Sequence, residues 1–282
     1  MYQIKYFVLA ILGMAVLLVM NNCNKDNAAQ PEADAPALPP ITTFVMNFDD
    51  FAQSNLEKAT DETSGHLLKP LSKNNWLFAA ANVYFWQTTL FVTLAVPTHS
   101  FQAAFLKDRI PEYSDGTWIW SYNFNSLAGL YHAELHGKIV SDEVEWEMYI
   151  TKQNVYENFK WFTGKSKLAA TEGTWTLNKE PQDPVPMLAI EWHRNLDDLT
   201  YDIKYINVLD LSDEKGSYIF NGVTNDTTYD AFYTLYHVKD NNFTEIKWNR
   251  ISKDGQVKDT KHFGDEDWHC WDENGDDITC GN

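Results

Sequence analysis

Residues 117–126 read TWIWSYNFNS, and this stretch sets the period on which the fold assignment depends. Trp118, Trp120 and Tyr122 occupy alternate positions, with small polar residues between the later ones. Successive side chains of a strand point to opposite faces of a sheet. The stretch therefore predicts a strand with one buried aromatic face and one wetter face.

The same alternation recurs along the rest of the chain. Residues 143–150 read EVEWEMYI, in which glutamates alternate with large apolar residues. Similar patterns fit residues 188–193, 201–205, 216–222, 229–238 and 243–251. Turns are expected at the Asp-Gly, Glu-Gly and Asn-Gly pairs at 115–116, 172–173, 221–222, 254–255 and 274–275. Because no helix separates them, about nine to eleven strands should form an antiparallel β-meander, closed into a barrel or bent into a half-barrel.

The region before these strands is typical of helices. Residues 75–94 read NWLFAAANVYFWQTTLFVTL, and Asn82, Thr89 and Thr93 form one narrow polar stripe. A helix this apolar is buried in a core or in a membrane. The stripe and the acidic character of the remaining chain favour a core helix.

Two shorter helices are expected beside it. Residues 47–58 have a weak amphipathic pattern. Pro97 should end the long helix, and Thr98 should cap a further helix over residues 100–107.

Composition narrows the class of protein. The 282 residues include 40 acidic and 22 basic ones, a formal net charge of −18, and 11 tryptophans. This charge argues against nucleic-acid binding through phosphate contacts, and the aromatic content is typical of a folded chain. We therefore predict a mainly β, α+β protein in which a helical subdomain, residues 43–112, packs on a meander domain, residues 113–282.

The N-terminus predicts export. Residues 1–22 carry Lys5 and then the apolar run 7–20, which has signal-peptide length, and Cys23 follows at once. An apolar run ending in a single cysteine resembles a bacterial lipoprotein signal, in which the cysteine is acylated. Lipidation of Cys23 is therefore expected, and an ordinary secretory signal with an unrelated cysteine is the alternative.

Residues 23–42 are rich in proline, alanine and acidic residues and show no apolar period. Such a composition predicts a disordered tether, which begins at the acylated Cys23. Lys25 and Asp26 resemble the lysine–acid pair of lipoprotein surface-export signals. The expected location is therefore the outer membrane, lipid-anchored, on the periplasmic face or the cell surface.

Residues 262–280 combine two cysteines with an acidic turn. The Asn-Gly turn should bring Cys270 and Cys280 nearly opposite each other, and an oxidising compartment predicts a disulfide between them. Asp265 and Asp267 are weak candidates for metal ligands, calcium being the ion that such carboxylates suit. A solvated acidic turn is the alternative, and we expect no cofactor.

His132 and His136 are the other weak metal candidates. They lie four residues apart in a strand-like stretch, so they share a face with Glu134 between them. A polar outer strand face accounts for the same pattern. No serine-nucleophile, phosphate-loop or dinucleotide motif occurs, so the sequence supports no enzyme class.

Recurrent aromatic residues on the strands suggest a binding function. Such residues line apolar cavities or stack on sugars, and equally they fill cores. The candidate lining residues are Trp118, Trp120, Tyr122, Trp146, Trp192 and Trp248. The leading hypothesis is non-enzymatic binding of an apolar or amphipathic ligand, or a glycan, in an aromatic interior.

Two alternatives stay open. The first is a surface adhesion or assembly module without a cavity. The second is a hydrolase whose site forms only in three dimensions, for example from Glu145, His132 and Asp267. Oligomeric state is not predicted.

Several segments carry a family resemblance: the lipoprotein-like start, WLFAAANVYFWQTTLFVTLAVP, GTWIWSYNF, EWEMYI and HFGDEDWHCWD. Together they resemble a family of uncharacterised Gram-negative outer-membrane lipoproteins, over nearly the whole mature chain. The resemblance implies a membrane location and assigns no catalytic residue.

Overall fold

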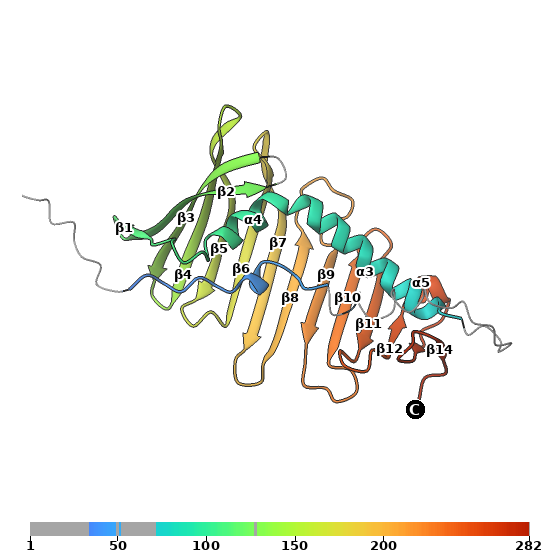
Figure 1. Cartoon of the computed structure of the whole chain (residues 1–282). Coiled ribbons are helices and arrows are strands. Elements are labelled where there is room, and N and C mark those ends of the chain that lie inside the picture. The colour runs from blue at the N-terminus through green and yellow to red at the C-terminus, as the bar shows by residue number, and fades with distance from the viewer. Residues whose placement is uncertain (1–33, 49–50, 52–71, 127–128, 282) are drawn as a thin grey trace, which may run out of the picture. The chain divides into compact units, whose positions relative to one another are not determined.

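Fourteen strands form one antiparallel sheet in the part of the chain that the structure, a computed structural model, describes (residues 34–48, 51, 72–126 and 129–281). Each strand pairs with its neighbours in chain order, which makes the sheet a meander (Figure 1). The strands are β1 (Glu112–Ser114), β2 (Thr117–Ser126), β3 (Gly129–Val140), β4 (Glu143–Lys152), β5 (Tyr156–Lys167), β6 (Glu172–Glu180), β7 (Asp183–Asn195), β8 (Thr200–Asn207), β9 (Tyr218–Val223), β10 (Ala231–His237), β11 (Asn242–Trp248), β12 (Gly255–Lys258), β13 (His269–Trp271) and β14 (Asp277–Ile278).

The mainly β, α+β class and the antiparallel meander are confirmed. The sheet is open, because the register pairs β1 only with β2 and β14 only with β13 among the described residues. The expected count of strands was too low. Among the strands that raise the count, β1, β13 and β14 lie near the ends of the sheet and have at most three residues, too few to show a period.

Helices cover one face of the sheet, which we call the inner face. They are η1 (Ile41–Thr43), α3 (Asn74–Thr93), α4 (Ala95–Ala103) and the short α5 (Thr260–Phe263). Figure 1 shows α3 crossing the sheet from the C-terminal strands, with α4 continuing toward the N-terminal ones and the segment around η1 beside them. The expected helix over 47–58 lies outside the described residues, apart from 47, 48 and 51.

Pro97 and Thr98 do not have the roles expected for them. α4 begins at Ala95, directly after Leu94, so Pro97 lies in its first turn. A proline is tolerated there because the first amides of a helix have no intrahelical acceptor. Thr98 is inside the helix, where its amide donates to the carbonyl of Leu94.

The break between α3 and α4 divides an apolar stretch that would otherwise be long enough to span a membrane. Within the described residues no single helix has the length and apolarity needed to cross a membrane. Residues 74–91 and 95–103 reach that length together, but their axes differ by 71°.

Residues 35–42 belong to the folded unit, although the tether was expected to include them. The compact unit comprises Ala35–Asn282, and Pro36 and Pro39 are buried within it. Prolines fit an extended segment of this kind because it needs few amide donors.

Large rings on the inner face lie over glycines in neighbouring strands. Gly164 of β5 is the direct partner of Trp146 on β4 and of Trp175 on β6, and Gly173 is the partner of Trp192. A Cβ on Gly164 would lie 2.1 Å from the Trp175 ring. Each indole therefore occupies the space that a side chain on its partner glycine would fill. This is a known way to stabilise glycine within a sheet.

This pairing corrects two of the predicted turns. Gly173 and Gly222 were expected at turns but lie inside β6 and β9. Gly222 makes room for the ring of Phe232, its partner on β10. The Asn-Gly turn at Gly275 is confirmed, because it joins β13 to β14 with a positive φ of 80°.

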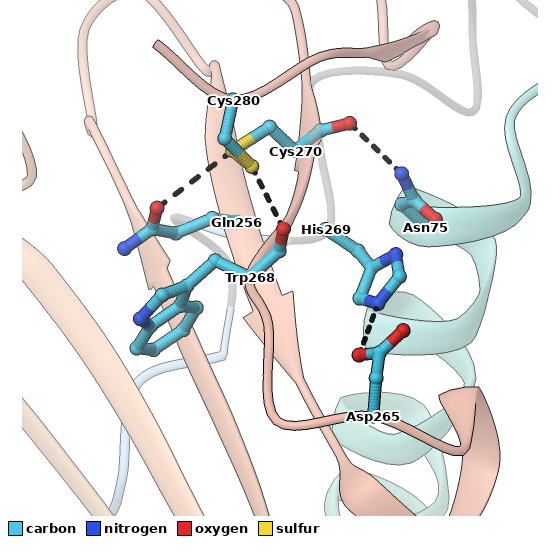
Figure 2. Close-up of a disulfide and its surroundings, with 7 residues drawn as sticks. All are labelled: Asn75, Gln256, Asp265, Trp268, His269, Cys270 and Cys280. Carbon is cyan, nitrogen blue, oxygen red and sulfur yellow. Dashed lines mark hydrogen bonds and ion pairs between the residues drawn. A yellow bond between two sulfur atoms is a disulfide. The ribbon is translucent and has the colours of Figure 1, made fainter. Parts of the chain in front are cut away.

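The C-terminal hairpin holds the start of α3. Cys270 and Cys280 form a disulfide, with their Cα atoms 5.2 Å apart (Figure 2). The Asp277 carboxylate accepts hydrogen bonds from the amides of Asn74 and Asn75 at 3.1 and 2.9 Å. Asn75 also donates its side-chain amide to the carbonyl of Cys270. A carboxylate here satisfies orphan amides and opposes the positive end of the helix dipole.

Replacing Gly164 with alanine should destabilise the protein by about 1–3 kcal/mol, because the added methyl group overpacks the Trp175 ring and the Thr174 carbonyl. Urea unfolding followed by circular dichroism measures this change. Gly281→Ala is the control, since a Cβ there meets no atom within 4 Å, and it should stay within about 0.5 kcal/mol of wild type. Equal stability of the two variants would contradict the packing argument.

Candidate functional site

A groove lies between the covering segments and the sheet, with a volume of about 410 Å³. Segment 41–48 forms one wall, α3 and α4 form the other, and Tyr205 of β8 contributes from the sheet. The volume falls within the usual range for small-molecule pockets, roughly 300–1,000 Å³. The lining residues are Ile41, Thr42, Phe44, Val45, Met46, Asn47, Phe48, Gln87, Leu90, Phe91, Leu94, Ala95, Thr98, His99, Gln102 and Tyr205.

The wall formed by residues 41–48 is fastened to the sheet by tyrosines. The Tyr205 hydroxyl donates to the carbonyl of Phe44 and accepts from the amide of Met46, both at 2.9 Å. The Tyr233 hydroxyl donates to the carbonyl of Asn47, also at 2.9 Å. These bonds satisfy backbone groups of a segment that belongs to no strand.

Phe44 fixes this wall from the side of the core. Its ring centroid lies 5.1 Å from that of Phe101, 4.8 Å from Phe162 and 5.7 Å from Trp175. Ring pairs at such distances and tilted angles stabilise beyond the area they bury. The ring is fully buried, so the wall is part of the core and not a loose flap.

The second wall is fastened in the same manner. The Tyr122 hydroxyl of β2 donates to the carbonyl of Ser100 at 2.8 Å, which holds α4 against the sheet. His99 contacts the Ser126 hydroxyl through its Nδ1 atom at 3.0 Å. Leu90 and Leu94 turn their side chains inward, whereas Phe91 lines the groove and is 64% exposed. The groove therefore reaches the surface at Phe91.

The groove carries no formal charge. No Asp, Glu, Lys or Arg is among its lining residues, and its polar groups are neutral amides, hydroxyls and one imidazole. Burial raises the pKa of Tyr205 above its ordinary value of 10.0, so its hydroxyl remains a protonated donor in neutral solution. Such a lining suits a mainly apolar ligand with a few hydrogen-bonding groups and offers nothing to an ionised one.

The six aromatic residues predicted to line a cavity do not line this groove. Five of them are core residues, at most 4% exposed, and Trp118 is partly buried. The Trp146 indole donates to the Ser166 hydroxyl at 2.9 Å, and the Tyr122 hydroxyl binds α4. The six are Trp118, Trp120, Tyr122, Trp146, Trp192 and Trp248.

His132 and His136 do share a strand face with Glu134, as predicted. Their Nε2 atoms lie 3.6 and 3.4 Å from the two Glu134 oxygens, so the carboxylate bridges the imidazoles. His132 also contacts Asn123 at 3.1 Å. Across the described ranges, no group of three His, Cys, Asp or Glu side chains is placed to hold a metal ion.

The acidic turn uses its carboxylates within the protein. Asp265 contacts His269 at 3.0 Å, and this hydrogen bond lowers the pKa of Asp265 (Figure 2). Asp267 donates its amide to Asp265. Asp272 accepts the amides of Asn274 and Asp276 at 2.8 and 3.0 Å, which makes the tight turn.

The residues considered for hydrolysis are not brought together. Glu145 pairs with Lys165 at 2.8 Å, on the outer face of the sheet. His132 is the partner of Thr151, six residues along β4 from Glu145 and therefore about 20 Å away. Asp267 lies two residues before β13, far along the strand order.

Comparison with protein-family models, with curated proteins and with solved structures gave no match. The geometry therefore carries the functional argument by itself.

Sequence reasoning missed the groove. Its walls come from residues 41–48 and 87–102, and Tyr205 is distant from both in sequence, so no local pattern joins them. One signal was present: residues 41–48 read ITTFVMNF, an apolar stretch placed directly after the proline-rich segment.

Replacing Tyr205 with phenylalanine should cost about 1–3 kcal/mol at pH 7, because it leaves the buried Phe44 carbonyl and Met46 amide without partners. A second effect concerns pH. The unfolded tyrosine ionises above about pH 10 while the folded one stays protonated, so stability falls as pH rises above that point. In the variant this contribution is removed, so the free energy of unfolding should fall less steeply above pH 10, by up to about 1.4 kcal/mol per pH unit.

Urea unfolding at pH 7 and at several values above pH 9 measures both effects. Tyr84→Phe is the control, because the Tyr84 side chain is exposed, and it should change neither quantity. An unchanged slope in the Tyr205 variant would show that the buried hydroxyl does not drive the alkaline loss of stability.

Proposed function

We propose that this chain is a lipid-anchored binding protein whose groove takes an uncharged, apolar or amphipathic small molecule. The observation that carries the proposal is the neutral groove of about 410 Å³, whose two walls are fastened to a rigid sheet. Preformed, mostly apolar pockets with a few polar groups are the usual form of small-molecule sites.

The groove favours an apolar ligand over a glycan. Sugar binding needs exposed aromatic faces, and the tryptophans that suggested it are core residues, with Trp118 alone partly exposed. Leu90 and Phe91 instead offer the groove an aliphatic and an aromatic side chain.

The anchor is proposed from the N-terminal sequence. An apolar run at residues 7–20 followed by Cys23 supports acylation of that cysteine, and residues after it connect it to the folded unit at Ala35. Two or more acyl chains give stable membrane attachment. We place the protein on the outer membrane, facing the periplasm or the cell surface.

Filling the groove tests the binding function. Gln87→Trp adds an indole to the lining, and Thr88→Trp adds one at the neighbouring exposed position, which does not line the groove. Titration with a neutral naphthylamine dye that fluoresces in apolar sites should give at least about tenfold weaker binding for Gln87→Trp alone, because the added side chain takes up the ligand's volume.

The titration uses the chain from Asn24 onward, which keeps the whole core, since the buried core residues lie between Phe44 and Trp271. Native mass spectrometry of the same preparation would show any ligand retained from the cell. No dye binding by wild type, together with a bare mass, would favour a packed adhesion module instead.

Replacing Cys23 with serine tests the anchor. The full chain, expressed in a Gram-negative host with an alkynyl fatty acid, should label when wild type and lose the label when Cys23→Ser, because the thiol is the proposed acylation site. Cys280→Ser is the control and should keep the label, since Cys280 is paired with Cys270. Label retained by the Cys23 variant would refute acylation at this residue.

A further inference from the structure

We propose that the outward side of α3, with the chain just after α4, lies on the surface of a lipid bilayer. This helical apolar face is defined by six exposed residues: Leu77, Tyr84, Phe85, Phe91, Phe105 and Leu106. The proposal rests on the proposed function in one respect, because the lipid anchor would bring this face to a membrane.

On α3 the helical apolar face is the outer side of a helix whose inner side is already buried. Trp76, Val83 and Leu90 pack toward the sheet and are at most 6% exposed. On the opposite side Tyr84 is 68% and Phe85 is 61% exposed. Rings of this size, exposed in a row on one helix, mark an interaction surface more often than a solvated one.

No charged side chain lies between Lys73 and Lys107, the stretch that contains α3 and α4. Residues 74–106 contain no Asp, Glu, Lys or Arg, although such residues make up 22% of the chain. An uncharged surface on a chain of net charge −18 suits the hydrocarbon boundary of a membrane, where a charge is costly.

Two exposed threonines of α3 bind their own helix. The Thr89 hydroxyl donates to the carbonyl of Phe85 at 2.9 Å, and the Thr93 hydroxyl donates to that of Thr89 at 2.7 Å. The partly buried Asn82 donates to the carbonyl of Phe78 at 2.9 Å. Donors satisfied within a helix need no water, which is a requirement for burial in lipid.

The proposed anchor keeps this face within reach of the membrane. Eleven residues separate Cys23 from Ala35, and the twelve steps along the chain span at most about 43 Å when extended. α3 has 20 residues and is therefore about 30 Å long, which is less than the reach of the extended tether. An aromatic helix lying in the interface buries its apolar side in the headgroup region.

The groove opens onto the same face. Phe91 belongs both to the helical apolar face and to the groove lining. With the face on a bilayer, an apolar ligand would pass between membrane and groove without crossing water. We therefore assign a membrane-dissolved ligand to this groove.

Vesicle binding tests the docking face without the anchor. The chain from Asn24 onward should sediment with phosphatidylcholine vesicles. The double variant Tyr84→Glu, Phe85→Glu should partition at least about tenfold less, because two carboxylates replace two rings that the bilayer would bury. Phe243→Glu on β11 is the matched control. It places a charge on an exposed ring (47%) outside the helical face and should partition like wild type.

Other readouts separate the possible failures. Dye binding in the groove should be unchanged in the double variant, because neither residue lines it, and circular dichroism should show a folded protein. Equal sedimentation of wild type and double variant, or none for wild type, would overturn the docking proposal while leaving the groove intact. A wild-type dimer that the double variant converts to monomer, without vesicle binding, would assign the face to a second copy and also overturn it.

Discussion

The contact between strand glycines and the indoles of neighbouring strands is the constraint on which this structure depends. Gly164 and Gly173 leave room for Trp175 and Trp192, and any side chain at either glycine would displace a ring. The rings then form an aromatic layer on the inner face. That layer is the surface on which segment 41–48 and the helices pack, so the groove depends on it indirectly.

A second set of contacts fixes the cover to this layer. Tyr122, Tyr205 and Tyr233 each reach from the sheet to a backbone carbonyl of a covering segment. Asp277 reaches the first amides of α3 from the opposite end of the chain. Hydrogen bonds of this kind specify position, because a shifted segment would leave buried polar groups without partners. The groove is consequently preformed.

Strand alternation made much of the fold predictable, because residues 117–126 and 143–150 bury every second side chain. The predictions of turns at Gly173 and Gly222 were wrong because glycine has two roles in a sheet. It allows the chain to turn, and it leaves room for a ring on the neighbouring strand, and the sequence alone does not distinguish the two. The short strands β13 and β14 carry too few residues to show a period. The candidate site was not predictable, since Phe44, Leu90 and Tyr205 meet only through tertiary packing and the predicted tryptophans serve the core.

The cap of α3 has a consequence for biosynthesis. The helix begins at Asn74, whereas the carboxylate that caps it belongs to Asp277. The ribosome therefore makes the start of the helix about two hundred residues before it makes the cap. An apolar helix made this early stays without its docking partner until the last strand has been synthesised and β13 has paired with β14. The order of synthesis therefore prolongs the exposure of an apolar segment, and exposed apolar surface on an incomplete chain favours aggregation.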